Sequence, residues 1–315
     1  MTASSCSVVI PVKDEAESLP ELVRRLLAVA ATLPTDAFEI VLVDDGSTDG
    51  SWAVIRELSA DPRVRGLRLR RNFGKAAALQ AGITAATGAV VVTMDADLQD
   101  DPEELPRFLD ALAGPVDVVS GWKRVRHDPW HKTLPSRLFN AVTARVSGVP
   151  LHDFNCGFKA YRREVFRDLN LYGELHRFVP VLAHDRGFRI AELEVRHHPR
   201  RHGRSKYGMA RLFRGAVDLL TVLTIGRYAQ RPGHLFGGVG LILGSIGFLL
   251  LLYLTLLKLL TGADIGTRPL LQLGVLLSIV GIQTVLFGML AELVIARSAP
   301  PDPATLVAER TDPRP

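Results

Sequence analysis

Acidic side chains recur at three separate points in the first third of the chain, and each group follows a short apolar run. The groups are Asp14-Glu15, Asp44-Asp45 and Asp95-Ala96-Asp97. Carboxylates brought to one place would repel one another unless a cation lay among them. Mg²⁺ and Mn²⁺ prefer oxygen ligands and are typically held by one or two carboxylates together with substrate phosphates. The pattern therefore predicts a divalent metal and a phosphorylated ligand.

The elements that must position these acids alternate between strand-like and helix-like segments, which is the signature of a parallel sheet flanked by helices. Short apolar runs predict strands at Ser7–Pro11, Glu39–Val43, Val64–Leu69, Ala89–Met94 and Val116–Ser120. Amphipathic spacing predicts helices at Ser18–Ala31, Thr48–Leu58 and Lys75–Ala86. Ser18, with Glu21 three residues on, is expected to cap the first helix. Ligands of open α/β sheets bind beyond the carboxyl ends of the strands, so the acids are expected to meet in one crevice.

The apolar residues are concentrated near the C-terminus. Residues 232–257 and 269–291 contain no Asp, Glu, Lys or Arg, and each stretch exceeds the roughly 20 residues that cross a bilayer. With 47% hydrophobic residues, the chain does not belong to the disordered class. Two cysteines are too few for a disulfide framework, and Cys156 is expected to be a small buried residue. The composition predicts a membrane protein with a large water-soluble head.

A basic window precedes the first apolar stretch. From Arg196 to Arg214 the chain carries seven Arg and Lys residues and no acidic one. Such a cluster beside a membrane indicates contact with anionic lipid or phosphate at the cytoplasmic face; a solvated charge run is the plainer alternative. Met209–Ile225 has one narrow polar stripe, which favours a helix in the membrane interface over an ordinary core helix. The positive-inside rule places the head in the cytoplasm.

Four segments of the first 120 residues occur together in a recognisable order and spacing. They are Pro11-Val12-Lys13-Asp14-Glu15, Val43-Asp44-Asp45-Gly46-Ser47-Thr48-Asp49, Asn72-Phe73-Gly74-Lys75 and Asp95-Ala96-Asp97-Leu98-Gln99-Asp100. In these segments the chain resembles glycosyltransferase family 2, which has the GT-A fold. Residues 200–207 and the two apolar stretches resemble the polyprenyl-phosphate glycosyltransferases of the dolichol-phosphate mannose synthase type. The resemblance implies transfer of a hexose from a nucleotide diphosphate sugar to polyprenyl phosphate, with inversion at the anomeric carbon.

The resemblance also implies roles on the donor side. The residues that would bind the nucleotide-sugar are Pro11, Asp14, Glu15, Asp44, Asp45, Lys75, Asp95 and Ala96. Asp14 and Asp45 suit the base and ribose because carboxylates accept from N–H and hydroxyl groups; Asp44 is the supporting neighbour or the contact itself. Asp97 and Gln99 would hold Mg²⁺ or Mn²⁺ on the diphosphate in a Lewis-acid role. Helix capping by Asp100 or Asp101 ahead of Pro102 is a compatible structural role.

The acceptor side is predicted to consist of four cations, one serine and one acid. The residues where the family contacts the acceptor phosphate are Arg124, Lys132, Arg137, Ser205 and Lys206, although surface solvation is the alternative for each. Because a phosphate monoester is largely ionised at neutral pH, a strong general base is not required. Asp153 is therefore expected to act as an orienting or electrostatic residue, and the role of general base is the second choice. The predicted catalytic residues are Asp153, Asp95 and Arg124.

These inferences predict a membrane-attached, metal-dependent, inverting hexosyltransferase. UDP-glucose is the favoured donor, because the two-helix tail resembles that of glucosyl-type bacterial enzymes, and GDP-mannose is the alternative. A catalytically silent nucleotide-binding scaffold is the rival class, and Asp95, Asp97 and Gln99 count against it. An oxidoreductase would need Gly-x-Gly-x-x-Gly after the first strand, where it is absent. No nucleic acid partner is expected.

The predicted domain organisation has four parts. They are a GT-A catalytic domain at 1–208, an amphipathic juxtamembrane segment at 209–231, two transmembrane helices at 232–295 and a disordered, Pro-rich tail at 296–315. The protein is thus expected to be an integral, multi-pass membrane protein. Gly240, Gly244 and Gly247 would permit close packing of the first span against the second span or another subunit, so a homo-oligomer is left open.

Overall fold

The computed structural model describes residues 5–34, 37–124, 130–167, 169, 171–198 and 232–297. The described residues up to 198 belong to one compact unit, an α/β domain, and residues 232–297 form a second unit, a helical hairpin. The predicted interfacial helix, the basic window from residue 199 onward and the C-terminal tail lie outside the described residues.

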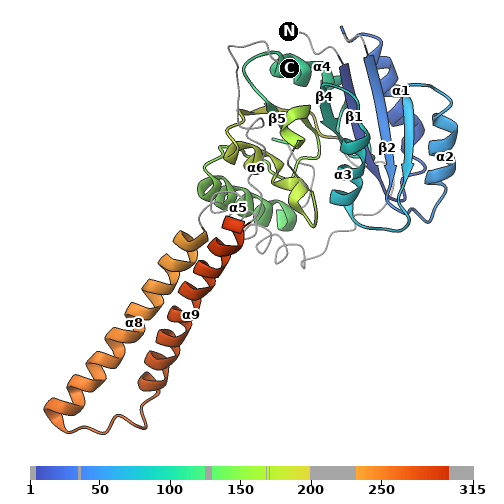
Figure 1. The fold of residues 1–315 in the computed structure, drawn as a ribbon. Coiled ribbons are helices and arrows are strands. Elements are labelled where there is room, and N and C mark those ends of the chain that lie inside the picture. The colour runs from blue at the N-terminus through green and yellow to red at the C-terminus, as the bar shows by residue number, and fades with distance from the viewer. Residues whose placement is uncertain are drawn as a thin grey trace. The chain divides into compact units, whose positions relative to one another are not determined.

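A seven-stranded sheet organises the first unit (Figure 1). Its strands are β1 (Ser5–Val12), β2 (Ala37–Asp44), β3 (Val64–Arg68), β4 (Val90–Thr93), β5 (Val118–Trp122), β6 (Lys159–Arg162) and β7 (Ile190–Glu194), in the order β3-β2-β1-β4-β6-β5-β7. β1 pairs in parallel with β2 and β4, and β2 with β3. β6 runs antiparallel to β4 and β5, and β7 is parallel to β5. The predicted mainly parallel α/β class is confirmed.

Two of these strands were not predicted. β6 and β7 have the sequences Lys-Ala-Tyr-Arg and Ile-Ala-Glu-Leu-Glu, which are too short and too charged to show strand periodicity clearly. β6 takes its place in the sheet through pairing with β4 and β5. Its antiparallel insertion brings the segment around residue 157 to the carboxyl end of β4, and so adds residues to the predicted crevice.

Helices cover both faces of the sheet. They are α1 (Leu19–Ala30), α2 (Ser51–Leu58), α3 (Lys75–Ala85), α4 (Leu105–Ala113), α5 (Trp130–Ser147) and α6 (Val179–Asp185), with 3-10 turns η1 (Pro102–Glu104), η2 (Arg163–Phe166) and η3 (Leu175–Arg177). Val8 and Ile10 of β1 join the core cluster that includes α1, α2 and α4. Val9 points to the other face, toward Gly82 of α3. A Cβ on Gly82 would lie only 2.4 Å from Val9 Cγ1. Gly82 therefore allows α3 to pack closely on the sheet.

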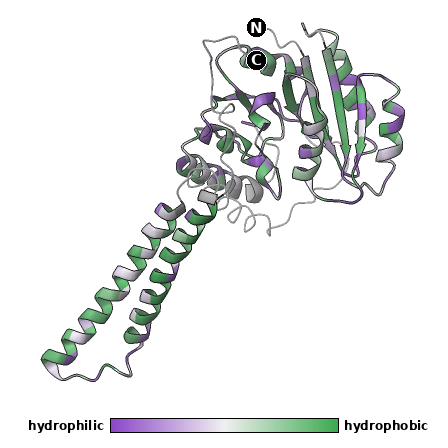
Figure 2. Ribbon diagram, viewed as in Figure 1, coloured by the Kyte–Doolittle hydropathy of each residue, from purple (hydrophilic) through white to green (hydrophobic). Residues whose placement is uncertain are grey.

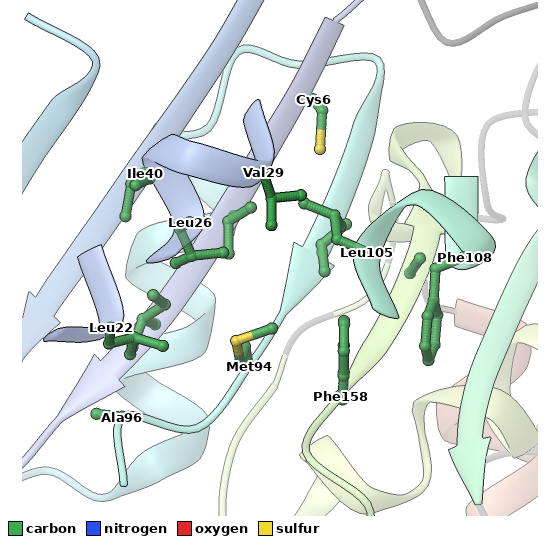
Figure 3. Close-up of a cluster of buried hydrophobic side chains, with 14 of the residues drawn as sticks. Cys6, Leu22, Leu26, Val29, Ile40, Met94, Ala96, Leu105, Phe108 and Phe158 are labelled. Carbon is green, nitrogen blue, oxygen red and sulfur yellow. The ribbon is translucent and has the colours of Figure 1, made fainter. Parts of the chain in front are cut away.

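The hydrophobic core lies between α1, α4 and the sheet (Figure 3). The Phe108 and Phe158 rings stack with centroids 4.2 Å apart. Met94, Ala96 and Leu98 are buried in the same cluster, and each fully buried large apolar side chain contributes about 1.5–3 kcal/mol. Asp95 and Asp97 lie between these buried residues, so the anchoring of Met94, Ala96 and Leu98 in the core fixes the position of the segment that carries the two acids.

The start of α1 differs from the prediction. The Ser18 side chain makes no capping hydrogen bond to the helix; its hydroxyl donates to the Glu15 carbonyl oxygen at 3.0 Å. Glu21 pairs with Arg24, whose Nη2 lies 2.7 Å from Oε2. The predicted capping box was wrong because the Ser18 hydroxyl binds Glu15 and the Glu21 carboxylate binds Arg24. The predicted cap before Pro102 is confirmed, since the Asp101 side chain accepts from Glu103 N at 3.1 Å.

The second unit consists of α8 (Pro232–Thr261) and α9 (Pro269–Arg297), which are apolar along most of their length (Figure 2). The spans Gly233–Thr261 and Pro269–Val294, of 29 and 26 residues, contain 18-residue windows with mean hydropathies of 2.4 and 2.2, which is consistent with two membrane-spanning helices. A Cβ on Gly240 would lie 2.6 Å from the Gly281 carbonyl oxygen, and one on Gly247 would lie 2.6 Å from Ser278 N. The small residues of α8 therefore allow close packing on α9.

Candidate active site

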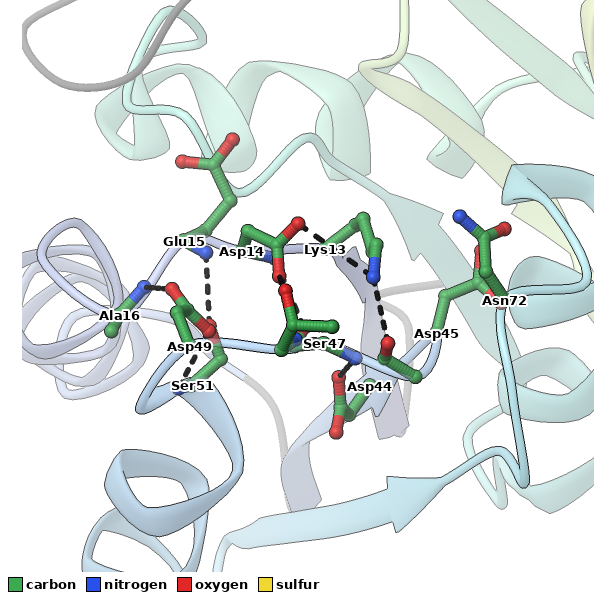
Figure 4. A network of polar contacts seen from close by, with 12 residues as sticks. Lys13, Asp14, Glu15, Ala16, Asp44, Asp45, Ser47, Asp49, Ser51 and Asn72 are labelled. Carbon is green, nitrogen blue, oxygen red and sulfur yellow. Dashed lines mark hydrogen bonds and ion pairs between the residues drawn. The ribbon is translucent and has the colours of Figure 1, made fainter.

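The loops after β1 and β2 are joined by a polar network (Figure 4). Asp14 Oδ1 accepts from Thr48 N at 2.8 Å and from Thr48 Oγ1 at 3.2 Å, and Ser47 Oγ accepts from Asp14 N at 3.0 Å. Asp14 has a φ of 52°, a left-handed conformation that is uncommon for a residue other than glycine. Glu15 N donates to Ser51 Oγ at 2.9 Å. The two loops thus hold each other in one arrangement.

The two acids that follow one another at the end of β2 have different surroundings. Asp44 is fully buried, accepts from Ser47 N at 2.8 Å and lies 3.3 Å from Arg68 Nε. Asp45 accepts from the backbone N–H groups of Phe73 at 2.7 Å and Gly74 at 3.0 Å. The burial of Asp44 and its hydrogen bond to Ser47 favour the supporting role over direct contact, and this role stays a prediction. Asp45 organises the loop that carries Lys75.

Gly46 is required by the same loop. Its φ is 64°, and a Cβ would lie 2.5 Å from the carbonyl carbon of Arg71 and 2.6 Å from Asn72 N. Any other residue would meet both a strained backbone conformation and a clash with atoms that cannot rotate away. The absence of a side chain at residue 46 is what lets the 71–74 loop lie against the end of β2.

Asp95 lies at the end of β4 in an ion pair with Lys75. A Cβ on Gly157 would lie within 2.7 Å of all three atoms of the Asp95 carboxyl group, so the carboxylate rests directly on the backbone of the segment before β6. Burial alone would raise the pKa of Asp95. The charges of Lys75 and Lys123 and the Lys75 hydrogen bond outweigh it and hold that pKa well below its ordinary value.

Asp97 and Gln99 follow on a tight turn. Asp97 is 8% exposed, and its Oδ1 accepts from Gln99 N at 3.2 Å. Leu98, between them, has a φ of 59°, which is costly for a residue with a large side chain. Among the described residues, no group of three or more His, Cys, Asp or Glu could hold a metal ion. One carboxylate and one amide oxygen fit a cation that takes its remaining ligands from substrate phosphates and water.

Lys123, which was not predicted as a site residue, lies close to the segment 95–100, and its side chain is 13% exposed. Lys123 Nζ is 2.7 Å from Asp100 Oδ1. Burial would lower the pKa of Lys123, but negative neighbours, led by Asp100 and including Asp95, raise it. Cys156 is nearby and buried, and burial raises its pKa to about 12, which confirms the prediction of a small buried residue. The position of Lys123 at the carboxyl end of β5 was the signal that could have identified it.

The start of the basic window contacts the segment that carries the predicted metal ligands, Asp97 and Gln99. His198 N donates to the Gln99 carbonyl oxygen at 2.9 Å, and His198 Nε2 lies 3.1 Å from Asp101 Oδ2. Asp101 also pairs with Arg25 of α1, whose Nη2 is 2.5 Å from Oδ1. Burial opposes the ionised form, but the His198, Glu103 and Arg25 contacts lower the pKa of Asp101. The chain therefore enters the undescribed basic segment right beside Gln99.

The predicted acceptor cations are only partly described. Arg124 is exposed, lies 3.4 Å from Glu194 and has its guanidinium carbon 5.9 Å from the centre of the Trp122 ring. Arg137 is exposed on α5, and Lys132 belongs to the same helix, but its side chain lies outside the described residues. Ser205 and Lys206 also lie outside them. No acceptor site is assembled from the described residues alone, and these roles stay predictions.

Asp153 is buried in the loop before β6, with 1% exposure. Its Oδ1 accepts from Asn155 N at 3.1 Å, and its own N–H donates to Glu192 Oε1 at 3.1 Å. Glu192 also binds the ring of His152, which stacks on Trp122 at 4.3 Å between centroids. Glu192 was not predicted as a site residue because it comes from β7, far along the chain. The surroundings of Asp153 favour the orienting role over the base.

The chain belongs to glycosyltransferase family 2. The model of that family, Glycosyl transferase family 2, matches residues 7–169. The dodecaprenyl-phosphate galacturonate synthase of Rhizobium johnstonii is 42% identical, covering 91% of this chain and 87% of the relative. The undecaprenyl-phosphate 4-deoxy-4-formamido-L-arabinose transferase of Aeromonas hydrophila is 38% identical, with the same coverage. The predicted resemblance to polyprenyl-phosphate glycosyltransferases is confirmed by these relatives.

Solved structures share the fold of the first unit. Glucosyl-3-phosphoglycerate synthase from Mycobacterium tuberculosis, in complex with Mn²⁺, uridine-diphosphate-glucose and glycerol 3-phosphate, has a TM-score of 0.53. It is 19% identical, and the alignment covers 70% of this chain and 79% of that chain. At this identity the likeness establishes the fold alone, and it agrees with the predicted GT-A class.

Proposed function

We propose that the protein transfers a sugar from a nucleotide diphosphate sugar to polyprenyl phosphate, in a reaction that depends on a divalent metal and inverts the anomeric carbon. The observation that carries the proposal is the convergence of acids from β1, β2 and β4 in a chain that continues into two long apolar helices. The names of the relatives, which join a polyprenyl phosphate to a sugar, support the acceptor.

On the donor side, Asp14 and Asp45 are proposed to contact the base and ribose, with Pro11, Glu15 and Asp44 supporting the loops that carry them. The Lys75–Asp95 ion pair is proposed to place the sugar and its diphosphate above β4. Asp97 and Gln99 would hold Mg²⁺ or Mn²⁺, both of which prefer oxygen ligands. When bound, such a cation neutralises charge that develops on the leaving diphosphate.

On the acceptor side, the lipid phosphate is proposed to attack directly, because it is already largely ionised at neutral pH. Arg124, Lys132, Arg137, Ser205 and Lys206 are proposed to place its oxygens in line, which contributes through orientation more than through proton transfer. Asp153 is proposed to hold the 152–157 loop against the site through its contacts with Asn155. We further propose that α8 and α9 span the membrane with the catalytic unit in the cytoplasm.

The names of the relatives bear on the donor sugar as well as on the acceptor. UDP-glucose, the donor favoured by the sequence, is not supported by the relatives, whose names carry galacturonate and 4-deoxy-4-formamido-L-arabinose. UDP is retained as the proposed nucleotide, and UDP-glucose and GDP-mannose remain in the panel of donors to be tested. A silent scaffold is disfavoured because the acids and Gln99 of the metal motif are intact.

The test uses the full-length protein in phospholipid vesicles with polyprenyl phosphate, Mn²⁺ or Mg²⁺ and a panel of nucleotide-sugars. We expect transfer of one sugar to the lipid, and a loss of at least about 100-fold in kcat/KM in Asp97→Asn, since a metal supplies several kcal/mol of charge stabilisation. UDP-dependent binding of Mn²⁺ should weaken in the same variant. Asp110→Asn, which removes an exposed carboxylate from α4, is the matched control. Unaltered turnover in Asp97→Asn would remove the metal assignment.

A further inference from the structure

The loop before β6, residues 152–157, ends at Gly157, on whose backbone the Asp95 carboxylate rests. At this end the loop is held by two neighbouring strands. Thr93 Oγ1 of β4 donates to the Gly157 carbonyl oxygen at 2.8 Å, and the buried amine of Lys159 in β6 donates to two carbonyl oxygens of the loop. Thr93 and Lys159 face each other in the β4–β6 pair, so this end of the loop is part of the sheet edge.

At the other end of the loop the acceptor is the carboxylate of Glu192 in β7. Its Oε1 accepts from the backbone N–H groups of His152 at 2.7 Å and Asp153 at 3.1 Å, and its Oε2 lies 2.6 Å from His152 Nδ1. The Glu192 side chain is 11% exposed, whereas that of Glu194, two residues further along the strand, is 49% exposed. Glu192 is therefore turned toward the loop and gathers three donors on one group.

The ring of His152 supports the same point of the chain. It stacks on Trp122 of β5, with centroids 4.3 Å apart and planes 19° from parallel. Asn140 Nδ2 of α5 donates to the His152 carbonyl oxygen at 2.9 Å. Glu192 and Trp122 belong to neighbouring strands, since β7 pairs in parallel with β5. The carboxylate, the imidazole and the start of the loop thus form one unit that is anchored on two paired strands.

A carboxylate that accepts from two successive N–H groups fixes the direction of the chain between them. Hydrogen bonds to an ionised acceptor are stronger than those between neutral groups, and a buried N–H group that loses its partner costs free energy. Asp153 is 1% exposed, and its Oδ1 accepts from Asn155 N at 3.1 Å. The place of the Asp153 side chain therefore follows from where Glu192 holds its backbone.

We propose that Glu192 is a positioning residue for sugar transfer, which holds the backbone of residues 152 and 153 and thereby fixes the place of Asp153 in the site. The inference rests on the proposed function, in which Asp153 holds the loop against the site, and adds to it a residue from β7. A purely structural Glu192 would behave differently, because its loss would weaken the fold and nucleotide binding together with turnover.

The test uses full-length protein in phospholipid vesicles with polyprenyl phosphate, Mn²⁺ and whichever of UDP-galacturonate, UDP-glucose and GDP-mannose the wild-type protein uses. Glu192→Leu removes all three hydrogen bonds and keeps a side chain of similar size. We expect kcat to fall about 100-fold, because a displacement of about 1 Å in a site can have that effect, while the affinity for the matching nucleoside diphosphate with Mn²⁺ stays within about twofold. Glu192→Gln, which keeps an oxygen for the two N–H groups, should lose only about tenfold in kcat. Glu57→Leu, which replaces an exposed carboxylate of α2, is the matched control and should keep the wild-type kcat.

Two further readouts separate positioning from a general structural effect. In Glu192→Leu the backbone amides of residues 152 and 153 should exchange hydrogen at least about tenfold faster, while those of β5 keep their wild-type rates. Glu192→Leu combined with Asp153→Asn should give a kcat no more than about threefold below that of the less active single variant, because residues that act as one unit have non-additive effects.

Three results would each overturn the inference and leave the proposed function intact. They are losses of kcat that multiply in the double variant, unchanged hydrogen exchange at residues 152 and 153, and a loss of nucleotide affinity as large as the loss of kcat. If Glu192→Leu fails to fold, Glu192→Gln decides on the same readouts. No transfer by the wild-type protein from any of the three donors would instead count against the proposed function.

Discussion

Both ends of the parallel strands carry acids with little solvent exposure, but the groups that bind these acids differ between the two ends. At the amino ends, Glu39 of β2 accepts from Ser7 Oγ and Thr87 N at 2.6 Å each and from Arg65 Nη1 at 3.0 Å. Burial would raise the pKa of Glu39, but these donors lower it to about 2. At the carboxyl ends, the acids come from several strands, and those near the metal motif are balanced by the lysines at 75 and 123.

The comparison separates acids that stabilise the fold from acids that are available to a ligand. Around Glu39 the donors belong to regular strands and their flanking turns, and none of the residues that the structure describes there has a positive φ. At the carboxyl ends, Asp14 and Leu98 both have positive φ values, a strain of about 1–3 kcal/mol each that persists only where the surroundings impose it. We therefore expect changes at the amino ends to affect stability and changes at the carboxyl ends to affect activity.

Gly157→Ala should have the largest effect of the changes that test this difference. A Cβ would lie 2.6 Å from Asp95 Oδ2, so the carboxylate and Lys75 must move. Because a displacement of about 1 Å in a site can cost about 100-fold in rate, we expect a loss of that size in kcat/KM. The free energy of unfolding of the catalytic unit should fall by only about 1–3 kcal/mol.

Gly114→Ala is the control for that substitution, since a Cβ at residue 114 meets nothing closer than 3.7 Å. It should leave both activity and stability close to those of the wild type. Full activity in Gly157→Ala would mean that the position of Asp95 does not matter to the reaction, and the assignment of the carboxyl ends as the functional side would fail.

Glu39→Gln should show the opposite behaviour. The folded pKa of Glu39 lies below its unfolded value of 4.5, so the ionised carboxylate stabilises the fold above that pH, and the contribution is lost as the pH falls toward 2. The linkage corresponds to about 3 kcal/mol at neutral pH, and solvent screening of the partly exposed carboxylate lowers the contribution that unfolding measures. We expect urea unfolding to show a stability loss of about 2 kcal/mol at pH 7 that shrinks between pH 4.5 and 2, with kcat/KM within about twofold of the wild type. A variant that lost activity at full stability would reverse the comparison.

The reactivity of the two cysteines tests the same difference between the strand ends, with the smallest expected effect. Cys6 lies near the amino end of β1 and Cys156 near the carboxyl ends, and burial raises the pKa of each thiol to about 12. Neither should react with iodoacetamide at pH 8 in the folded protein, because the thiolate is the reactive form. At low urea, before global unfolding, Cys156 should be labelled first if the strained end opens locally. Labelling of Cys6 first would show that the amino ends are the less stable region.

Much of the fold could be read from the chain because its signals are local. Apolar runs of strand length, each followed by a polar turn and an amphipathic helix, indicated β1 to β5 and the helices between them, and the same pattern put Asp14, Asp45 and Asp97 beyond strand ends. The prediction of a capping box at Ser18 was wrong because the hydrogen-bond partner of a side chain depends on which groups lie near it in the folded chain. β6 and β7 were missed because their place depends on pairing with distant strands.

The amino-acid sequence by itself therefore determined the family, the class of sheet, the acids at the carboxyl ends of the strands and the two long apolar helices, since each depends on residue types at short, regular spacing. Only the tertiary structure decided that Lys123 pairs with Asp100, that Lys159 and His176 line a cavity with Asp95, and that Glu192 binds His152 and the Asp153 backbone. It also decided that Gly157 supports Asp95, and that residues 197 and 198 contact the segment 99–101. These contacts join segments that are many residues apart in the sequence. The four residues of β6, whose antiparallel pairing brings some of these segments together, are too few to show strand periodicity.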